Sequence, residues 1–460
     1  MVKKLKTTNV VEYPTPNPEP IHALQKEFSL CQATGRLSLI RNSDFTTGDE
    51  TATESFFSLK DGEILMRRHI TELGLLVHDS QFRFIFSDFF ESPNTRMIRR
   101  TCFDPDERGH DCLNYWVEPL IKPRQGDWQI IKDWLFEILC DSDQEGFDYL
   151  IRWLAHLIQR PKEKPEVMLV LMGDEGTGKG TLFKILKRIF GRAIYSAEKP
   201  DQIVGRFNAI LNRMLIVWSD EAIFVGNAAG QESLKSLITE EYITTELKHQ
   251  ELKSIRSYHR FIATTNKEHF AQISVNNRRN AFYRVSDKQK QNRSYFGKLL
   301  HAIDNTDALP AFVHHLTTLD LTEFDPTKRP ITEELKNQKL LSLNGVARYL
   351  KEVLDTENFV LVKDDKVPIG GAPYIGRPRI LTRDFHEYYT LYDKSAERHA
   401  PLQQKAIKSK VKELIPSASD YRANDKHGIE FPVLDIARQE FQSYLTHDIE
   451  DWNLPTKKDK

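Results

Sequence analysis

An apolar segment that runs into a glycine-rich loop and then into a helical pattern constrains the fold of this chain most strongly. The segment is VMLVLMGDEGTGKGTLFKIL, residues 167–186. Its glycines let successive backbone N–H groups face one phosphate, and the following helix directs the positive end of its dipole to the same point. The lysine adds a mobile charge for the β and γ phosphates. We therefore expect an α/β fold with a mainly parallel sheet, and a phosphate site formed by Gly173, Gly176, Thr177, Gly178, Lys179, Gly180 and Thr181.

The residue that follows the lysine departs from the usual pattern. In the common form of this loop, Ser or Thr comes next and its hydroxyl binds Mg²⁺. Here Gly180 takes that position, and Thr181 is moved one residue along the chain. We expect Thr181 to contact a phosphate and to hold Mg²⁺ through water. The same GKGT ending occurs in small nucleotide kinases that resemble adenylate kinase, so the loop alone leaves a kinase and an ATP hydrolase open.

Two adjacent carboxylates end the next apolar segment, MLIVWSDEA, residues 214–222. Asp220 suits Mg²⁺, and Glu221 suits activation of a water molecule. A kinase must keep water away from the transferred phosphoryl group. The pair therefore favours hydrolysis over transfer to a nucleotide.

Further polar residues follow a third apolar segment, HRFIATTN, residues 259–266. The amide of Asn266 can orient the attacking water and sense the γ phosphate. Arg278 and Arg279 come next, and paired guanidinium groups match phosphate oxygens in a planar fork. In a ring of ATPase subunits, one such arginine reaches the γ phosphate bound by the neighbouring subunit. That role requires the chain to assemble.

These motifs, in this order, resemble those of superfamily 3 helicases, in particular the ATPase half of phage and mobile-element primase-helicases. The resemblance covers about residues 110–345. It implies an AAA+ type P-loop core, a hexameric ring around one DNA strand, ATP and Mg²⁺ as cofactors, and the residue roles given above. A primase-polymerase module would need paired acidic metal ligands before residue 110, and we find no convincing set there. Priming activity is therefore not predicted.

The resemblance also implies a DNA-binding hairpin in YITTELKHQELKSIRSY, residues 242–258. Lys248 and His249 would lie near its tip, where Lys248 could bind successive phosphates and His249 could stack or form a hydrogen bond. Without the resemblance, a solvated turn explains the same residues.

Composition limits the other function classes. The 65 basic and 66 acidic side chains give a net charge of −1, so nucleic acid must be bound by a local patch. Four cysteines in 460 residues do not form a disulfide framework, and they indicate a reducing cytoplasm. The start has lysines but no apolar stretch behind them, and no long uncharged apolar run occurs elsewhere. We expect a protein of the bacterial or host cytoplasm without membrane partners.

The sequence pattern suggests six regions. We expect an N-terminal part rich in α-helix, with a strand-like segment at residues 81–90, and a strand pair near residues 427–437. Lysines 405, 408, 410 and 412 form either a basic face or a solvated helix. The regions are a flexible proline-rich tail (1–20), a globular region of unknown role (21–125), a helical lead-in (126–162), the ATPase core (163–300), a helical extension (301–366) and a small winged-helix-like domain (380–450).

The leading hypothesis is an ATP-dependent DNA helicase that serves replication of a phage, plasmid or mobile genetic element. Its expected partners are single-stranded or forked DNA, further copies of the chain, and a primase or polymerase. A nucleotide kinase remains as one alternative, although no arginine-rich lid follows the loop. The other alternative is an ATP-binding, DNA-binding assembly factor that does not unwind DNA.

Overall fold

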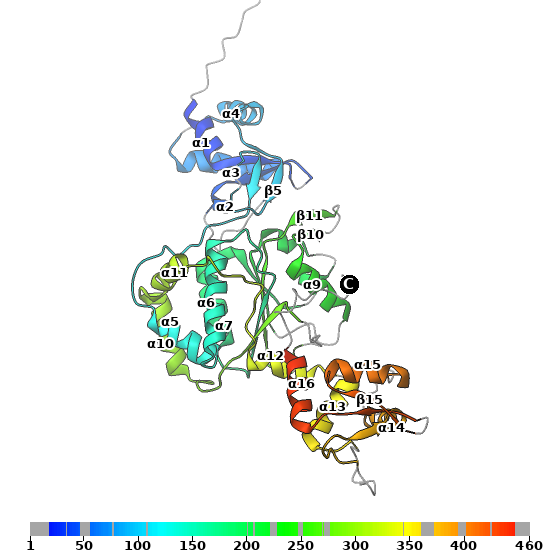
Figure 1. The fold of residues 1–460 in the computed structure, drawn as a ribbon. Helices are drawn as coiled ribbons and strands as arrows, with labels where there is room; N and C mark the ends of the chain where they lie inside the picture. The colour runs from blue at the N-terminus through cyan, green and yellow to red at the C-terminus, as the bar shows by residue number, and fades with distance from the viewer. Residues whose placement is uncertain are drawn as a thin grey trace, which may run out of the picture.

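The chain forms three parts that follow one another in sequence, and the computed structural model in Figure 1 shows them arranged in a row. The N-terminal part (blue) and the C-terminal part (orange and red) lie at opposite ends of a larger central part. The described residues are 18–33, 35–46, 56–75, 78–106, 109–199, 201–205, 208–220, 228–246, 252–268, 270, 277–343, 345–359, 372–393, 402–423 and 426–446.

The N-terminal part combines helices with a small sheet, and most of its regular structure is helical, as the sequence predicts. Its sheet has the order β3-β2-β1-β4, and a separate parallel pair joins β5 to β6. The bounds are α1 (Pro18–Glu27), β1 (Phe28–Cys31), β2 (Ser38–Arg41), α2 (Ser43–Thr46), β3 (Phe56–Phe57), α3 (Leu59–Glu72), α4 (Asp79–Glu91), β4 (Met97–Ile98), β5 (Arg100–Cys102) and β6 (Cys112–Asn114).

Residues 81–90, expected to be strand-like, lie inside helix α4. Phe82, Ile85 and Phe89 are buried at helical spacing, whereas Phe84 remains 54% exposed. The alternation of Phe82, Phe84 and Phe86 suggested a period of two. Burial of a stripe at a period of 3.6 residues determined the structure instead.

The central part is built on five parallel strands in the order β13-β7-β12-β9-β8. Strand β7 alternates between two cores: Leu169 and Leu171 face one, and Met168, Val170 and Met172 face the other. The parallel sheet expected from the sequence is therefore confirmed. Its strands are β7 (Met168–Met172), β8 (Ile194–Ala197), β9 (Ile216–Ser219), β12 (Arg260–Thr265) and β13 (Asn280–Arg284).

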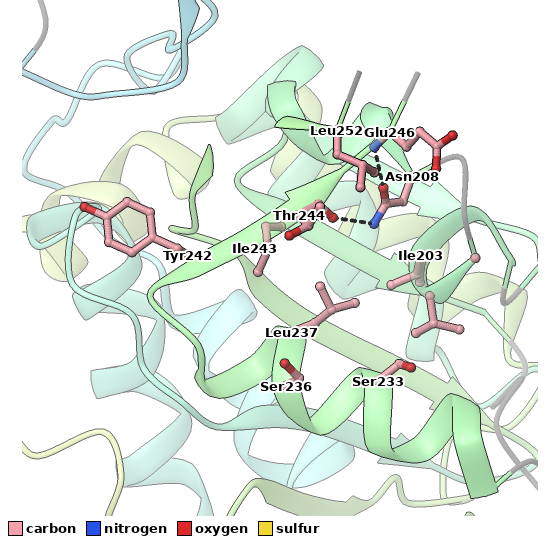
Figure 2. Close-up of a pocket in the computed structure, with 12 residues that line it drawn as sticks. Ile203, Asn208, Ser233, Ser236, Leu237, Tyr242, Ile243, Thr244, Glu246 and Leu252 are labelled. Carbon is pink, nitrogen blue, oxygen red and sulfur yellow. Dashed lines mark hydrogen bonds between the residues drawn. The ribbon is translucent and has the colours of Figure 1, made fainter. Parts of the chain in front are cut away.

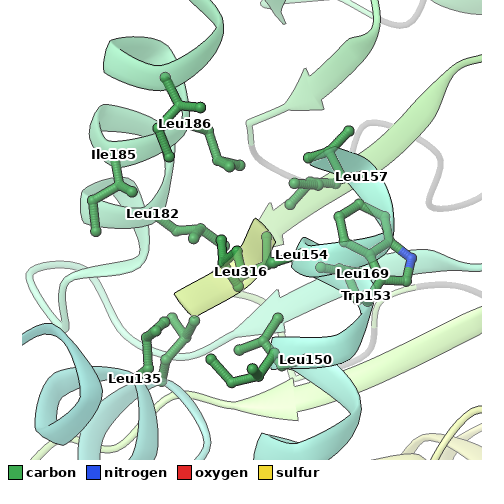
Figure 3. Close-up of a cluster of buried hydrophobic side chains, with 14 of the residues drawn as sticks. Leu135, Leu150, Trp153, Leu154, Leu157, Leu169, Leu182, Ile185, Leu186 and Leu316 are labelled. Atoms are coloured by element: carbon green, nitrogen blue, oxygen red, sulfur yellow. The ribbon is translucent and has the colours of Figure 1, made fainter. Parts of the chain in front are cut away.

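The larger core lies between one face of this sheet and a layer of helices. Figure 3 shows α6 and α7 contributing leucine, isoleucine and tryptophan side chains to it, together with Leu135, Leu169 and Leu316. Trp134 and Trp153 are almost fully buried, which confirms that the tryptophans of the helical lead-in belong to the core. The helices of this layer are α5 (Gln129–Asp133), the π-helix η1 (Trp134–Leu139), α6 (Gln144–Gln159), α7 (Lys179–Phe190), α10 (Arg293–Asn305) and α11 (Ala308–Thr318).

The opposite face of the sheet carries α8 (Asp201–Val204), the 3₁₀-helix η3 (Ala209–Arg213), α9 (Ala228–Thr239) and a β-hairpin. The hairpin pairs β10 (Tyr242–Thr245) with antiparallel β11 (Lys253–Arg256), as the sequence predicts. Its tip, including Lys248 and His249, lies outside the described residues.

The C-terminal part has a three-stranded antiparallel sheet in the order β14-β16-β15. A strand pair is present as expected, but it is displaced, because β16 ends at Glu430 and residues 434–446 are helical. Its elements, with the preceding linker helix, are α12 (Glu333–Leu341), α13 (Gly345–Thr356), β14 (Arg379–Leu381), α14 (Thr382–Asp393), α15 (Gln404–Leu414), β15 (Ser419–Ala423), β16 (Lys426–Glu430) and α16 (Leu434–Thr446).

Within the described residues, no helix is both long enough and apolar enough to cross a membrane.

Candidate nucleotide site

The three motif strands end at one edge of the parallel sheet. Thr265 at the end of β12 pairs with Met172 at the end of β7, and Ala263 pairs with Ser219 at the end of β9. The residues that follow the three strands are Gly173, Asn266 and Asp220. In this way the sheet brings the glycine loop, the amide and one carboxylate together, although they are far apart in the sequence.

The glycine loop has the backbone that its sequence requires. Gly176 and Gly178 have φ angles of +80° and +97°, which L residues rarely adopt. Gly178 also lies against the ring of Phe296, which leaves no room for a Cβ. Gly180 differs, since a Cβ there would meet no described atom within 4 Å. The structure therefore gives no steric reason for glycine at position 180.

This contrast leads to a test of the loop. We expect Gly178→Ala to destabilise the protein by about 1–3 kcal/mol, because the left-handed backbone and the Phe296 contact both oppose a side chain. Gly180→Ala, in the exposed first turn of α7, should instead stabilise it by about 0.4–1 kcal/mol. Urea unfolding of both variants measures the difference. Equal destabilisation by the two alanines would contradict the loop geometry.

Lys179 extends over the loop. Its Nζ donates to the backbone oxygens of Gly173 and Asp174, the latter at 2.7 Å. Burial lowers the pKa of Lys179, and the nearby carboxylate of Asp220 opposes this effect. The loop cation therefore lies close enough to the strand-end carboxylate to interact with it electrostatically, an arrangement that suits phosphate and Mg²⁺ together.

The two threonines of the loop have different surroundings. Thr177 is fully buried, and its hydroxyl donates to the backbone oxygen of Asp174 at 2.8 Å. It therefore stabilises the loop itself. Thr181 is also buried, in the first turn of α7, where its backbone N–H donates to the oxygen of Gly178.

Asp220 is oriented by the neighbouring strand, because the hydroxyl of Thr264 donates to its Oδ1. No group of three or more His, Cys, Asp or Glu side chains within the described residues could hold a metal ion. Magnesium in nucleotide sites is commonly bound by one or two carboxylates together with substrate phosphates. Asp220 beside the loop fits that pattern. Glu221, the expected general base, lies outside the described residues.

Arg278 and Arg279 lie far from this loop in the same chain. The backbone oxygen of Arg279 accepts from Met168 at the start of β7, whereas the loop follows the end of β7. A strand of this length separates the two edges by roughly 15 Å. Arg279 instead lies near α9, where its charge lowers the pKa of Glu232, although less than the hydrogen bond from Lys235 does. The structure therefore does not bring these arginines together with the loop of their own chain.

The segment after β13 braces the loop, and this was not expected from the sequence. Lys290 forms an ion pair with Asp174, with 2.6 Å between Nζ and Oδ2. The backbone N–H of Gln291 donates to the oxygen of Gly176 at 2.9 Å. The residues in each contact are more than a hundred positions apart in the sequence, so no local sequence pattern predicts these contacts.

Comparisons with known proteins give the chain a set of relatives. Residues 171–284, which run from the end of β7 to the end of β13 and include the glycine loop, match a family of unknown function, DUF5906. Over 163 residues the chain is 30% identical to the DNA primase-polymerase of Nitratiruptor phage NrS-1. That stretch is 35% of this chain but 22% of the phage protein, so the chain matches only about a fifth of that relative.

The solved structures show that the similarity in fold extends further. Two apo structures of the NrS-1 C-terminal region have TM-scores of 0.58 and 0.59 with this chain, at 18% and 17% identity. They cover 89% and 91% of this chain, and 97% and 100% of their own chains. At such identities the likeness concerns the fold alone.

A pocket of about 450 Å³ lies between the hairpin and α9 (Figure 2). The side chain of Asn208 joins it to the hairpin: its amide donates to the oxygen of Thr244 at 3.4 Å, and its Oδ1 accepts from the N–H of Glu246 at 3.3 Å. Exposed apolar side chains of the hairpin, Tyr242 and Leu252, also line the pocket.

A half-buried lysine and a buried histidine hold the base of the hairpin. Lys164 donates to the backbone oxygens of Leu237 and Glu240 and to the hydroxyl of Ser257, at 2.6–2.7 Å. Burial lowers the pKa of Lys164 to about 8. The Nδ1 of His259 lies 2.9 Å from the hydroxyl of Ser257, and its Nε2 lies 2.8 Å from the oxygen of Leu211. One network therefore fixes both ends of the hairpin to the core.

His259 should make stability depend on pH. Burial lowers its pKa from 6.5 to about 4, so between these values the unfolded chain binds a proton that the folded chain does not. The contribution of His259 to the free energy of unfolding is therefore fully present above pH 6.5, and it falls by about 3 kcal/mol as the pH drops to 4. Unfolding of wild type and His259→Gln from pH 7 to 5, above most carboxylate titrations, measures this term. An unchanged pH dependence in the variant would contradict it.

Proposed function

We propose that this chain is an ATP-hydrolysing motor that moves on single-stranded DNA and acts as a helicase in the replication of a phage, plasmid or mobile element. The observation that carries the proposal is the common edge of the sheet, where Lys179, Asp220 and Asn266 converge around a glycine loop at the start of a helix. The named relative, a phage DNA primase-polymerase, supports a role in DNA replication.

The proposed chemistry divides among the glycine loop, the start of α7 and the polar residues that follow the motif strands in sequence. The loop N–H groups and Lys179 would bind the phosphates, Asp220 and Thr181 would hold Mg²⁺, and Glu221 would activate water that Asn266 orients. Mg²⁺ supplies neutralisation of the charge that develops on the phosphate oxygens. The strand order supports an AAA+ type core, because the strand bearing Asn266 lies between the loop strand and the carboxylate strand.

The position of the arginines supports a ring. Arg278 and Arg279 lie at the sheet edge opposite to the loop, so they cannot reach the phosphates bound in their own chain. An arginine of a neighbouring copy could do so, and it would stabilise the transition state there. We therefore propose a homo-oligomer, a hexamer by the resemblance, with active sites between subunits.

The hairpin supports contact with DNA. Its strands project from the face that carries α9, and Lys248 and His249 belong to the segment between the strands. In a ring this segment would enter the channel and bind successive phosphates of one strand. The C-terminal element order of helix, strand, two helices, strand, strand and helix supports a winged-helix-like domain.

Strand separation tests the proposal against its two alternatives. The wild-type chain should release the labelled strand of a forked duplex when ATP and Mg²⁺ are present. An assembly factor would bind DNA and ATP without releasing the strand. A nucleotide kinase would transfer the labelled γ phosphate to a nucleoside monophosphate or diphosphate. Either result in place of unwinding would refute the helicase.

A further inference from the structure

A basic cleft of about 460 Å³ lies on the C-terminal domain, distant in sequence from the nucleotide loop. It is formed where β14 passes into α14, where α15 begins, and where β16 starts after the β15–β16 turn. The lining residues are Leu381, Thr382, Arg383, Gln404, Lys405, Lys408, Lys426 and His427. They include four cations and no carboxylate.

Thr382 provides a polar group that the fold does not use. Its side chain is only 6% exposed, and its Oγ1 has no hydrogen-bond partner among the described residues. A buried hydroxyl without a partner is destabilising unless something else binds it. Thr382 is also the first residue of α14, where the helix dipole favours an anion. A hydroxyl and a helix start therefore face the same cleft.

A second helix start lies on the other side of the cleft. α15 begins at Gln404, and its N-cap residue Gln403 makes no side-chain capping bond. Lys405 and Lys408 follow in the first turns of α15. Each feature favours negative charge, and together they describe a site for phosphate groups.

The carboxylates near the cleft leave it positively charged. Asp420 is shared between Lys408 at 3.2 Å and Lys412 at 3.0 Å. Asp384 lies 3.1 Å from Arg383, whose side chain is 75% exposed. Lys405 of α15 and the neighbouring residues Lys426 and His427 of β16 line the cleft and are exposed. Asp420 and Asp384 are therefore too few to neutralise the lysines and the arginine around the cleft.

We propose that this cleft binds the phosphodiester backbone of duplex DNA, as a site separate from the single-strand path of the motor. The choice of DNA as the polyanion rests on the proposed function. A duplex fits better than a single strand because no Phe, Tyr or Trp lines the cleft, and single strands are commonly bound by stacking on such side chains. A helix flanked by a hairpin also matches the shape of a duplex groove.

Duplex binding by the full-length chain tests the proposal. A short labelled duplex is titrated at several salt concentrations, without ATP, with wild type, Thr382→Val and the double variant Lys405→Ala/Lys426→Ala. The double variant should bind at least about tenfold more weakly at low salt, and its slope of log affinity against log salt should fall by about 1.8. Thr382→Val should bind about threefold to tenfold more weakly.

Lys410→Ala is the matched control. Lys410 also lies on α15, but it pairs with Glu413 at 2.7 Å and does not line the cleft. The proposal is overturned if the double variant binds like wild type, if Lys410→Ala weakens binding equally, or if single-stranded DNA, ATP or inorganic phosphate competes as well as duplex. Repeating the titration with Lys179→Ala separates this site from the motor: loss of ATP hydrolysis with intact duplex binding leaves the cleft proposal standing.

Discussion

Replacing Lys179 with alanine is expected to reduce ATP hydrolysis by at least about 100-fold, the scale of losing one preorganised group at a developing charge. The ammonium group of Lys179 is already placed over the loop by the oxygens of Gly173 and Asp174. It also interacts with Asp220 across the site. Its removal deletes the only cation that the loop motif itself supplies to the β and γ phosphates. Steady-state phosphate release with Mg²⁺ and ATP measures the effect.

Lys184→Ala provides the matched control, since Lys184 is an exposed lysine on the same helix, α7. It should hydrolyse ATP like wild type. Thermal unfolding of both variants shows whether the chain remains folded. A folded Lys179→Ala protein that retains wild-type turnover would refute the nucleotide site, whereas loss of turnover in both variants would show a general effect of lowering the charge on α7.

Removal of the arginine that we propose to act across a subunit interface should produce the second large effect, about 1,000-fold or more in turnover. Arg278→Ala and Arg279→Ala identify which of the two is responsible. ATP binding should be nearly unchanged in the responsible variant, because the loop of the same chain lies at the other edge of the sheet. Measuring nucleotide affinity beside turnover separates these two quantities.

Mixing inactive variants tests whether the arginine acts in trans. A chain with Lys179→Ala keeps its arginines, and a chain with the arginine variant keeps its loop. Mixed rings should regain part of the activity, since some interfaces pair an intact loop with an intact arginine. If neither arginine matters, or if mixing restores nothing while both variants assemble, the interface model is wrong.

The sequence predicted the parts of the site that arise from local pattern. The order of apolar segment, glycine loop and helix located β7, the loop and α7 correctly. The apolar segments that end in Asp220 and Asn266 proved to be adjacent parallel strands, and a hairpin was present where one was expected. These features could be predicted from the sequence because parallel strands end at one edge of a sheet, and because backbone positions with positive φ angles favour glycine.

Other features of the structure depend on contacts between segments that are distant in the sequence, so they could not be predicted from local patterns. Lys290 beside Asp174 and Phe296 beside Gly178 are placed by the return of the chain after β13. The helix α4 resembled a strand because its phenylalanines alternate, and only packing against the N-terminal core reveals the helical stripe. The hydroxyl of Thr382, which has no hydrogen-bond partner in the part of the chain that the structure describes, likewise has no signature in sequence, because its burial depends on how β14, α14 and α15 meet.

The most direct test of the central claim is ATP turnover by the purified chain with and without single-stranded DNA, with Lys179→Ala as the blank. A motor whose hairpin contacts DNA should hydrolyse ATP several times faster when the strand is present, and the variant should show neither the basal nor the stimulated rate. Robust turnover that ignores DNA, or transfer of phosphate to a nucleotide, would contradict the account.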